Sequence, residues 1–380
     1  MSRERIYLDW NATTPLRPEA RAAMALALDA IGNPSSVHEE GRAARSLVEE
    51  ARATVAKAVG TQTRNVVFTS GGTEANALAL APGLHQHAGA PVKRLIVSAI
   101  EHPSVLAGGR FSPGAIAQAP VTQQGVVDLD ALQSMLSDDG PALVSVMLAN
   151  NETGAIQPIA DIAALVRSAG GVLHVDAIQA LGKIPVDLSA LGADCITLAA
   201  HKLGGPKGVG ALVFTDELQG LNAALRGGGQ EQGRRAGTEN VAGIAGFGAA
   251  LKAAMMSMPD DAKRMGLLQR RLEAGLRAGR GVVIFADSVP RLPNTTLVAG
   301  PGMKAETAVI AFDLEGVAVS SGSACSSGKV QPSHVLAAMG IPASLAAGAL
   351  RLSTGWQTSE ADIDRTLEAW RKLSGVLGRE

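Results

Sequence analysis

Lys202 lies in a stretch whose residue types suit imine chemistry. Two apolar runs, 195–200 and 209–214, flank a glycine-rich turn that carries His201 and Lys202, and each run has the length of a buried strand. A lysine that directly follows a buried strand is partly desolvated, which lowers the pKa of its amine and makes it a better nucleophile. The same pattern also fits a surface lysine in a hairpin turn, so other parts of the chain must decide.

Further polar side chains follow other apolar runs. The runs at 66–69, 94–100, 142–148 and 171–175 alternate with helical segments such as 158–169, which is typical of βαβ units around a mostly parallel sheet. Ligands of such sheets bind beyond the carboxyl ends of the strands. We therefore expect the following residues to meet in one crevice: Thr73, His102, Asn151, Asp176, Gln179, His201 and Lys202.

An aspartate and a lysine at two strand ends suit pyridoxal phosphate, because the carboxylate pairs with the pyridinium nitrogen and the amine forms the Schiff base. The glycine turn at 70–76 begins a helix whose backbone amides, with Thr73, could bind phosphate. Such turns also occur for purely structural reasons. His102 could stack on a flat cofactor, transfer protons or simply cap a helix. Asp176 could likewise be a structural, hydrogen-bonded carboxylate.

The two cysteines have different surroundings. Cys195 lies in an apolar strand and should be a small buried hydrophobe, whereas Cys325 is surrounded by serines and glycines. This context predicts an exposed, mobile loop that suits a reactive thiol, although a plain loop cysteine fits too. Arg351 lies inside the apolar run 349–353, where an unpaired charge would be costly. A carboxylate, from the protein or from a substrate, would explain it.

The length and the pattern predict an α/β protein of two domains, because 380 residues are too many for one ordinary core. We expect a large domain at 15–258 and a smaller α/β domain made of 1–14 and 259–380, with the cysteine loop at about 320–330. The expected helices are at 18–30, 39–59, 241–255, 260–280 and 360–377, with Thr238 as the N-cap of the third and a border near Pro259.

Composition excludes several other classes of protein. The chain is 46% hydrophobic and 18% charged, with a net charge of −1, which indicates a globular fold and argues against nucleic-acid or polybasic membrane surfaces. The start lacks the apolar core of a signal peptide, and the longest apolar tract, 241–251, is too short to span a bilayer. We expect a cytoplasmic protein. Two cysteines exclude a disulfide framework and a cysteine-based zinc site, and no metal is expected.

Nearly from end to end, the chain resembles the cysteine desulfurases of the NifS/IscS type, which are fold-type I pyridoxal-phosphate enzymes of the class V aminotransferase family. Each motif alone has weak to moderate specificity, but their order and spacing are specific. The motifs are Tyr7-Leu-Asp9, Ser70-Gly-Gly-Thr-Glu74, Glu101-His102, Asn150-Asn151-Glu152, His174-Val-Asp-Ala177, His201-Lys202, Arg235-Ala-Gly-Thr238, Ser321-Gly-Ser-Ala-Cys325 and Arg351-Leu-Ser353.

The resemblance implies a role for each candidate residue. Lys202 would form the Schiff base, Asp176 would pair with the pyridinium nitrogen, and His102 would stack over the ring. Gln179 would contact the ring oxygen. Phosphate would be held by Gly72, Thr73, His201 and, from the partner subunit of a homodimer, Thr238. The substrate carboxylate would be held by Arg351, Asn151 and Asn11.

The resemblance also implies the reaction. L-Cysteine would give L-alanine and a persulfide on Cys325, whose sulfur passes to an acceptor such as an iron–sulfur scaffold protein, or serves transfer-RNA thiolation. Two departures are evident. Ala199 stands where the family usually has a serine, which removes one phosphate hydrogen bond, and the chain ends soon after its last expected helix, so the acceptor stays open. An aminotransferase, a selenocysteine or kynurenine lyase and a non-catalytic binding subunit are the alternatives.

Overall fold

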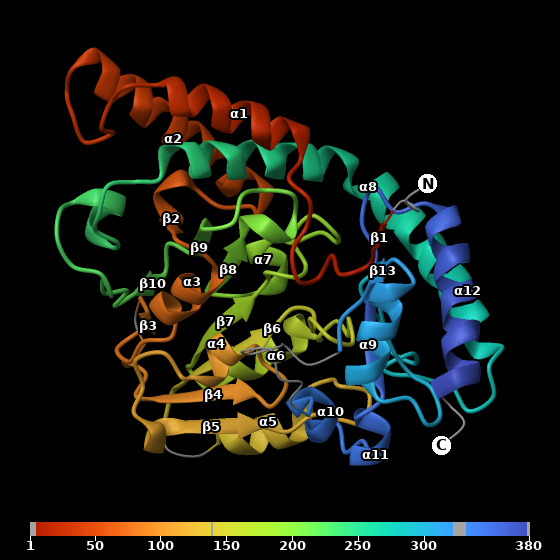
Figure 1. Ribbon diagram of the computed structural model, residues 1–380. Coiled ribbons are helices and arrows are strands. Elements are labelled where there is room, and N and C mark those ends of the chain that lie inside the picture. Colours follow the sequence, from red (N-terminus) through yellow and green to blue (C-terminus); the bar gives the residue numbers. More distant parts are fainter. Residues whose placement is uncertain (1–4, 88, 138–139, 322–331, 378–380) are drawn as a thin grey trace.

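The centre of the molecule is a seven-stranded sheet. The computed structural model describes residues 5–87, 89–137, 140–321 and 332–377 (Figure 1). In spatial order the strands are β2 (Val66–Thr69), β9 (Gly210–Phe214), β8 (Cys195–Ala199), β7 (Val172–Asp176), β6 (Ala142–Met147), β4 (Arg94–Ser98) and β5 (Ile116–Ala119). Strand β9 runs in the direction opposite to the other six strands, which are parallel to one another. The α/β fold class with a mostly parallel sheet is confirmed.

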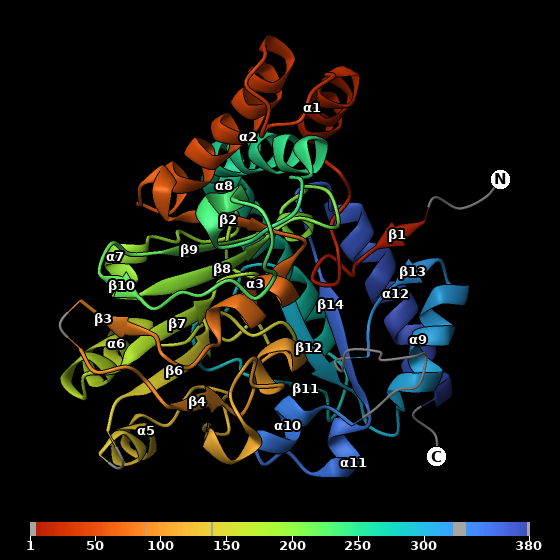
Figure 2. The same ribbon diagram turned by 90° about the vertical axis from the view of Figure 1, so that its left-hand side faces the viewer.

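Both faces of this sheet are covered, which explains why its strands are apolar runs and not alternating ones. Val66 and Phe68 point into the larger hydrophobic cluster, whereas Val67 between them points into a second cluster on the opposite face. The first face is covered by α1 (Pro18–Asp29), α2 (Glu39–Ala58), α5 (Leu129–Leu136), α6 (Ile159–Ser168) and the first half of α8 (Val241–Arg277), and the second by α3 (Gly72–Ala79) and α4 (Pro103–Leu106). Figure 2 shows α1, α2 and α8 stacked together above the sheet.

Helix α8 corrects one expectation. The break expected at Pro259 is absent, and α8 runs continuously from Val241 to Arg277. Proline inside a helix costs about 3 kcal/mol because it lacks an N–H and clashes with the preceding turn. Here both halves are buried: Phe247 and Leu251 pack in the large cluster, and Leu268 and Leu272 pack in a cluster of the small domain. This burial outweighs the cost. Figure 1 shows that α8 changes direction along its length and that its second half lies beside α12 (Glu360–Leu377).

The length and composition of α8 would also allow it to cross a membrane, but half of its most apolar window is buried inside the protein. It is the core helix on which α1 and α2 pack. The N-cap of α8 is the side chain of Asn240, which accepts a hydrogen bond from the backbone N–H of Gly243 at 3.0 Å. The expected cap, Thr238, is therefore wrong, because the helix starts one residue after Asn240.

The remaining elements form a smaller unit beside the sheet. A three-stranded antiparallel sheet has the strand order β11 (Val283–Ile284), β12 (Thr295–Ala299) and β14 (Ala349–Ser353). Strand β1 (Ile6–Tyr7) pairs with β13 (Val317–Ala318) in a separate two-stranded sheet. The helices of this unit are α9 (Ala305–Leu314), α10 (His334–Ala338), α11 (Ala343–Ala346) and α12. Ile6 and Leu8 pack in the same cluster as the last half of α8. The domain border stays a proposal.

Short elements connect these parts. They are the antiparallel pair β3 (His85–Gln86) and β10 (Leu218–Gln219), the helix α7 (Leu188–Leu191), and the 3₁₀ turns at Thr63–Asn65, Pro113–Ala115, Ala200–Lys202 and Gln230–Gly233. After β1 the chain passes from the small unit to the sheet, where the backbone N–H of Thr14 donates to the carbonyl of His201 at 2.9 Å. Residues 5–15 thus link both units next to Lys202.

Candidate functional site

A cavity of about 190 Å³ opens at the carboxyl ends of β6, β7 and β8. Strand-end residues of the sheet form its wall, as expected for a parallel sheet. Of the residues singled out in the sequence, the structure places the following in this wall: Gly72, Thr73, His102, Asn151, Asp176, Gln179, His201 and Lys202. Asn11 and Arg351 lie directly behind Asn151, because both donate to its backbone carbonyl. Thr238 and Cys325 are treated separately below.

Lys202 ends the 3₁₀ turn that follows β8, so its side chain enters the cavity from the strand end. Its Nζ donates to the backbone carbonyls of Asn11 and Ala12, at 2.5 and 2.9 Å. Burial lowers the pKa of Lys202 to about 8, and the neighbouring positive charge of Arg351 acts in the same direction. About a tenth of this amine is therefore neutral at pH 7, far more than for an ordinary lysine.

Asp176 is the last residue of β7, and it is buried. Its Oδ1 accepts from the backbone N–H of Ile178 at 3.0 Å, and its Oδ2 accepts from Nδ2 of Asn76 at 2.9 Å. Burial raises the pKa of Asp176, while these two hydrogen bonds favour the ionised form. The carboxylate is held as an acceptor on the cavity wall.

His102 caps α4, and this fixes its ring. Its Nδ1 accepts from the backbone N–H of Ser104 at 3.1 Å and lies 2.8 Å from Oγ of Ser104. Burial lowers the pKa of His102, which favours the neutral ring, and the backbone donor at Nδ1 leaves its proton on Nε2. The ring of His102 lines the cavity while its Nδ1 caps α4, so the capping role and a role in the cavity are compatible.

Lys183 was missed in the sequence. It is 6% exposed, and its Nζ donates to the side-chain oxygen of Gln179 and to the backbone carbonyl of Gln179, both at 3.0 Å. Nε2 of Gln179 in turn donates to the carbonyl of Asn11 at 2.9 Å. Burial lowers the pKa of Lys183 to about 7. The available signal was a lysine four residues after Gln179 in an otherwise apolar segment, 177–186.

The end of the cavity at α3 has the features of an anion site. Gly71, with φ of +155°, makes the turn from β2 into α3, and a Cβ on Gly72 would lie 2.3 Å from Ile178, so the backbone approaches the wall closely. Burial lowers the pKa of His201 to about 4, so this imidazole is neutral. Ala199 lines the same wall and offers no hydrogen bond.

Thr238 lies outside this wall, exposed in the segment between Gly237 and α8. The same segment is tied to α3 by Arg235, whose Nε donates to Oε1 of Glu74 at 2.9 Å. Cys325 falls outside the described residues. Cys195, as expected, is buried in β8, and burial raises the pKa of its thiol well above the usual value.

Arg351 has a protein carboxylate as its partner. Its Nη2 lies 2.7 Å from Oδ1 of Asp9, and its Nη1 donates to the carbonyl of Asn151 at 3.0 Å. Among the residues that the structure describes, Nε of Arg351 has no hydrogen-bond partner. The guanidinium thus keeps one buried donor free next to the cavity.

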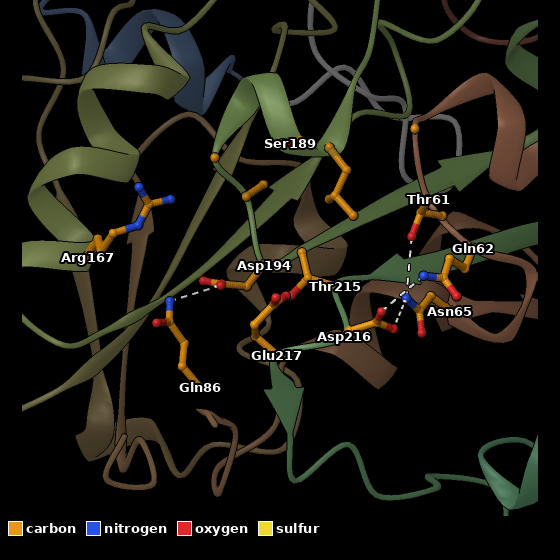
Figure 3. A pocket seen from close by; sticks show the side chains of 14 residues that line it. Thr61, Gln62, Asn65, Gln86, Arg167, Ser189, Asp194, Thr215, Asp216 and Glu217 are labelled. Carbon is orange, nitrogen blue, oxygen red and sulfur yellow. Dashed lines mark hydrogen bonds between the residues drawn. The ribbon is translucent and has the colours of Figure 1, made fainter. Parts of the chain in front are cut away.

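A larger cavity, of about 510 Å³, lies at the opposite end of the strands (Figure 3). Its two aspartates are already engaged: Asp194 accepts from Gln86 at 3.0 Å and from the backbone of Leu173 at 2.7 Å, and Asp216 pairs with Arg64. Among the residues that the structure describes, none of those lining it is a lysine or a histidine. The smaller cavity, where an amine, a carboxylate and an imidazole meet, is the better candidate for chemistry.

Comparison with known proteins agrees with this choice. The model of the aminotransferase class-V family matches residues 6–366. The chain is 40% identical to the cysteine desulfurase IscS of Dictyoglomus turgidum, covering 98% of this chain and 95% of that protein, and 43% identical to a cysteine desulfurase of Cereibacter sphaeroides, covering 96% and 94%. A NifS-like protein from Rickettsia africae has a similar structure, with a TM-score of 0.89, 36% identity, and coverage of 98% and 100%. The chain therefore belongs to the class-V aminotransferase family and, within it, to the cysteine desulfurases of the IscS/NifS type.

Proposed function

We propose that this protein is a pyridoxal-phosphate-dependent cysteine desulfurase that takes sulfur from L-cysteine, releases L-alanine and carries the sulfur on Cys325. The family generally implies this cofactor, and both relatives named above are cysteine desulfurases. The observation that carries the proposal is that Lys202, Asp176 and His102 line one cavity. These are the three groups that a pyridine aldehyde needs: an amine, a carboxylate and a flat ring.

The donor set fits the cofactor. Asp176 still has lone pairs for a pyridinium N–H, because each of its oxygens accepts only one hydrogen bond. The turn at Gly71 and Gly72 leaves room for a phosphate against the start of α3. Thr73 and His201 would add donors there. Lys202 would hold the aldehyde carbon, and Gln179 the ring oxygen.

When bound, the cofactor withdraws electrons from the α-carbon of the amino acid. The residues of this chain supply the rest. Neutral Lys202, with its pKa near 8, would accept the proton from the α-carbon. Asp176 would keep the ring nitrogen protonated, and His102 would cover the ring. Arg351, with its free Nε, would bind the substrate carboxylate together with Asn151 and Asn11.

The sulfur step belongs to Cys325. Its thiolate would attack the substrate sulfur, so that an S–S bond forms while the Cβ–S bond breaks; the electron pair stays on Cβ, which takes up a proton to give alanine. The described residues on either side of this segment support the reach of the thiol. Ser320 pairs with the backbone of Arg351, and Oγ of Ser333 donates to Oε2 of Glu152 at 2.6 Å. Both partners lie beside the substrate side of the cavity.

We further propose a homodimer in which the partner's Thr238 completes the phosphate site. The exposure of Thr238 outside the wall of its own cavity supports this arrangement. The sulfur would pass to an acceptor protein for iron–sulfur cluster assembly or for transfer-RNA thiolation, in the cytoplasm.

One assay tests the proposal. Purified protein is loaded with pyridoxal phosphate and given L-cysteine, and alanine, sulfide and the visible spectrum are recorded together. Equal amounts of alanine and of transferred sulfur are expected, with visible absorbance from the bound cofactor. A keto acid in place of alanine would identify an aminotransferase. No cofactor absorbance would identify a non-catalytic binding protein.

A further inference from the structure

Asn76 connects Asp176 and His102, two residues on different strand ends of the cavity. It lies one turn inside α3 and has no exposed surface. Its Nδ2 donates to Oδ2 of Asp176 and to Oγ of Ser104, both at 2.9 Å. Its Oδ1 accepts from Oγ of Thr197 at 2.6 Å. Both N–H groups of the amide and its oxygen are therefore used.

The direction of each hydrogen bond in this group is determined. If the amide of Asn76 were reversed, its oxygen would lie 2.9 Å from the carboxylate oxygen of Asp176, which would be repulsive. With the amide as found, Oγ of Ser104 accepts from Asn76 and must give its own proton to Nδ1 of His102, 2.8 Å away. Nδ1 of His102 thus receives two donors, this hydroxyl and the backbone N–H of Ser104 at 3.1 Å, and the His102 proton lies on Nε2.

The far side of the amide is fixed by the sheet. Thr197 is the register neighbour of Asp176 on the adjacent strand β8. Its hydroxyl gives its proton to Asn76 and receives one from Nε2 of His174 at 3.2 Å, while Nδ1 of His174 lies 2.8 Å from Oγ of Ser145. Burial lowers the pKa of His174 to about 3, so this ring stays neutral. A neutral ring can donate from only one nitrogen, which gives the chain of hydrogen bonds a single direction.

We infer that Asn76 is a positioning residue that sets two properties of the cavity at once: it holds Asp176 as an acceptor for a ring N–H, and it turns the hydroxyl of Ser104 toward Nδ1 of His102, where this second donor adds to the backbone N–H of Ser104 and keeps the ring from taking up a proton. The inference deepens the proposed function and rests on it for its purpose. A packing residue alone would need neither the donor to Asp176 nor the donor to Ser104, since an apolar side chain could fill the same volume.

Three isosteric or near-isosteric variants separate the two branches. Ser104→Ala removes only the link to His102. Thr197→Val removes the bond to the amide oxygen of Asn76 and, with it, the acceptor for Nε2 of His174. Asn76→Asp has the same shape, but it gives no donor to Ser104, and its carboxyl lies against Asp176, where two acids must share one proton. The first readout is ¹⁵N–¹H NMR of histidine-labelled, cofactor-free protein over a series of pH values, which reports the tautomer and the pKa of each of the seven histidines, with His102 assigned by a His102→Gln spectrum. The second is the dissociation constant of pyridoxal phosphate.

In the parent we expect His102 in the Nε2–H form alone. Ser104→Ala should keep this form, because the backbone N–H of residue 104 still donates to Nδ1, but the pKa of His102 should rise since the hydroxyl donor is lost, with cofactor affinity changed less than threefold. Asn76→Asp should also raise the pKa of His102 and should weaken cofactor binding by about 10-fold to 150-fold, because the charged hydrogen bond that holds Asp176 as an acceptor is lost. Thr197→Val should show both effects in weaker form, and it serves as the test if Asn76→Asp does not fold. A folded Asn76→Asp or Thr197→Val protein with an unchanged His102 pKa and unchanged affinity overturns the inference.

The pKa of His102 is read without cofactor and without turnover. A parent protein that fails to desulfurate cysteine would therefore contradict the proposed function while the role of Asn76 is still decided by the spectra.

Discussion

The guanidinium of Arg351 donates a hydrogen bond to the carboxylate of Asp9, with 2.7 Å between Nη2 and Oδ1. The sequence left open whether the partner of this buried arginine is a protein or a substrate carboxylate. The structure answers that Asp9 is one partner, while the unpaired Nε leaves capacity for a second. A substrate carboxylate would therefore add to the Asp9 pair and need not displace it.

Arg351→Lys should weaken the handling of substrate. Lysine keeps the charge but has no planar fork with which to serve Asp9, Asn151 and a substrate carboxylate together. We expect kcat/KM for L-cysteine to fall by about 10-fold to 150-fold, the range of one charged hydrogen bond. Asp9→Asn is the matched control and should change kcat/KM less than tenfold, since Nε is untouched. Equal losses in both variants would show that the ion pair, and not the free donor, matters.

The attachment of pyridoxal phosphate to the cofactor-free protein should depend on pH through Lys202. Only the neutral amine attacks an aldehyde, and the pKa of Lys202 is about 8, so the attachment rate should rise with pH and reach half its maximum near pH 8. Stopped-flow absorbance measures this rate. Arg351→Gln removes a neighbouring positive charge and should move the midpoint to higher pH. A rate that rises only above pH 10, as for an ordinary lysine, would contradict the assignment.

The two cysteines should behave oppositely in the native protein. Cys195 is buried with a raised pKa, so iodoacetamide should leave it unmodified. Cys325→Ala should abolish both labelling and sulfide release while keeping the visible absorbance of bound cofactor. Cys195→Ala is the control and should retain labelling and activity. If Cys325→Ala still releases sulfide from cysteine at the parent rate, another group is the nucleophile.

Lys183 should make stability depend on pH. Its pKa is about 7 in the folded protein and about 10.4 when unfolded. Between these values the unfolded chain binds more protons, so the contribution of Lys183 to the free energy of unfolding rises with pH, by up to about 1.4 kcal/mol per unit. Below pH 7 the contribution is flat and least favourable.

Urea unfolding of the cofactor-free parent and of Lys183→Met, at several values between pH 6 and 9, measures this contribution as a difference. The free energy of unfolding of the parent should increase relative to that of Lys183→Met as the pH rises above 7. A difference that is constant across this range would show that Lys183 keeps an ordinary pKa, because its hydrogen bonds to Gln179 then suffice to hold the charge.

Ala199→Ser should strengthen cofactor binding. Ala199 lines the cavity near Gly72, where a hydroxyl could reach the phosphate that we propose. One hydrogen bond to a charged group is worth about 1.5–3 kcal/mol, so the dissociation constant of pyridoxal phosphate should fall by about 10-fold to 150-fold. Ala199→Val adds volume without a hydroxyl and should weaken binding. Equal affinities for serine and alanine would place the phosphate elsewhere.

The sequence predicted the convergence of the cavity residues because the signals involved are local. Apolar runs of strand length and the turns that end them can be read directly, and the parallel-sheet rule then places Asp176, Gln179 and Lys202 together. The class of fold follows from the same alternation. Helix α12 was predicted at its observed start, because Ser359 and Asp362 give a clear capping signal.

What the sequence missed depends on contacts between distant residues. Asn76 and Asp176 are one hundred positions apart, and only the packing of α3 on the sheet brings them to 2.9 Å. The break expected at Pro259 did not occur because tertiary burial outweighed a local preference. The Asp9 partner of Arg351 likewise comes from the other end of the chain, through the bridge between Asp9 and Ser353.

The unbroken path of α8 through Pro259 has a consequence for how the molecule can be divided. A protease cut or an engineered fragment ending near this proline would divide α8 between two pieces. Because the two halves of α8 pack in two different hydrophobic clusters, the cut would break the helix that joins these clusters. Neither half should then persist alone in solution, and the two units should melt as one cooperative body.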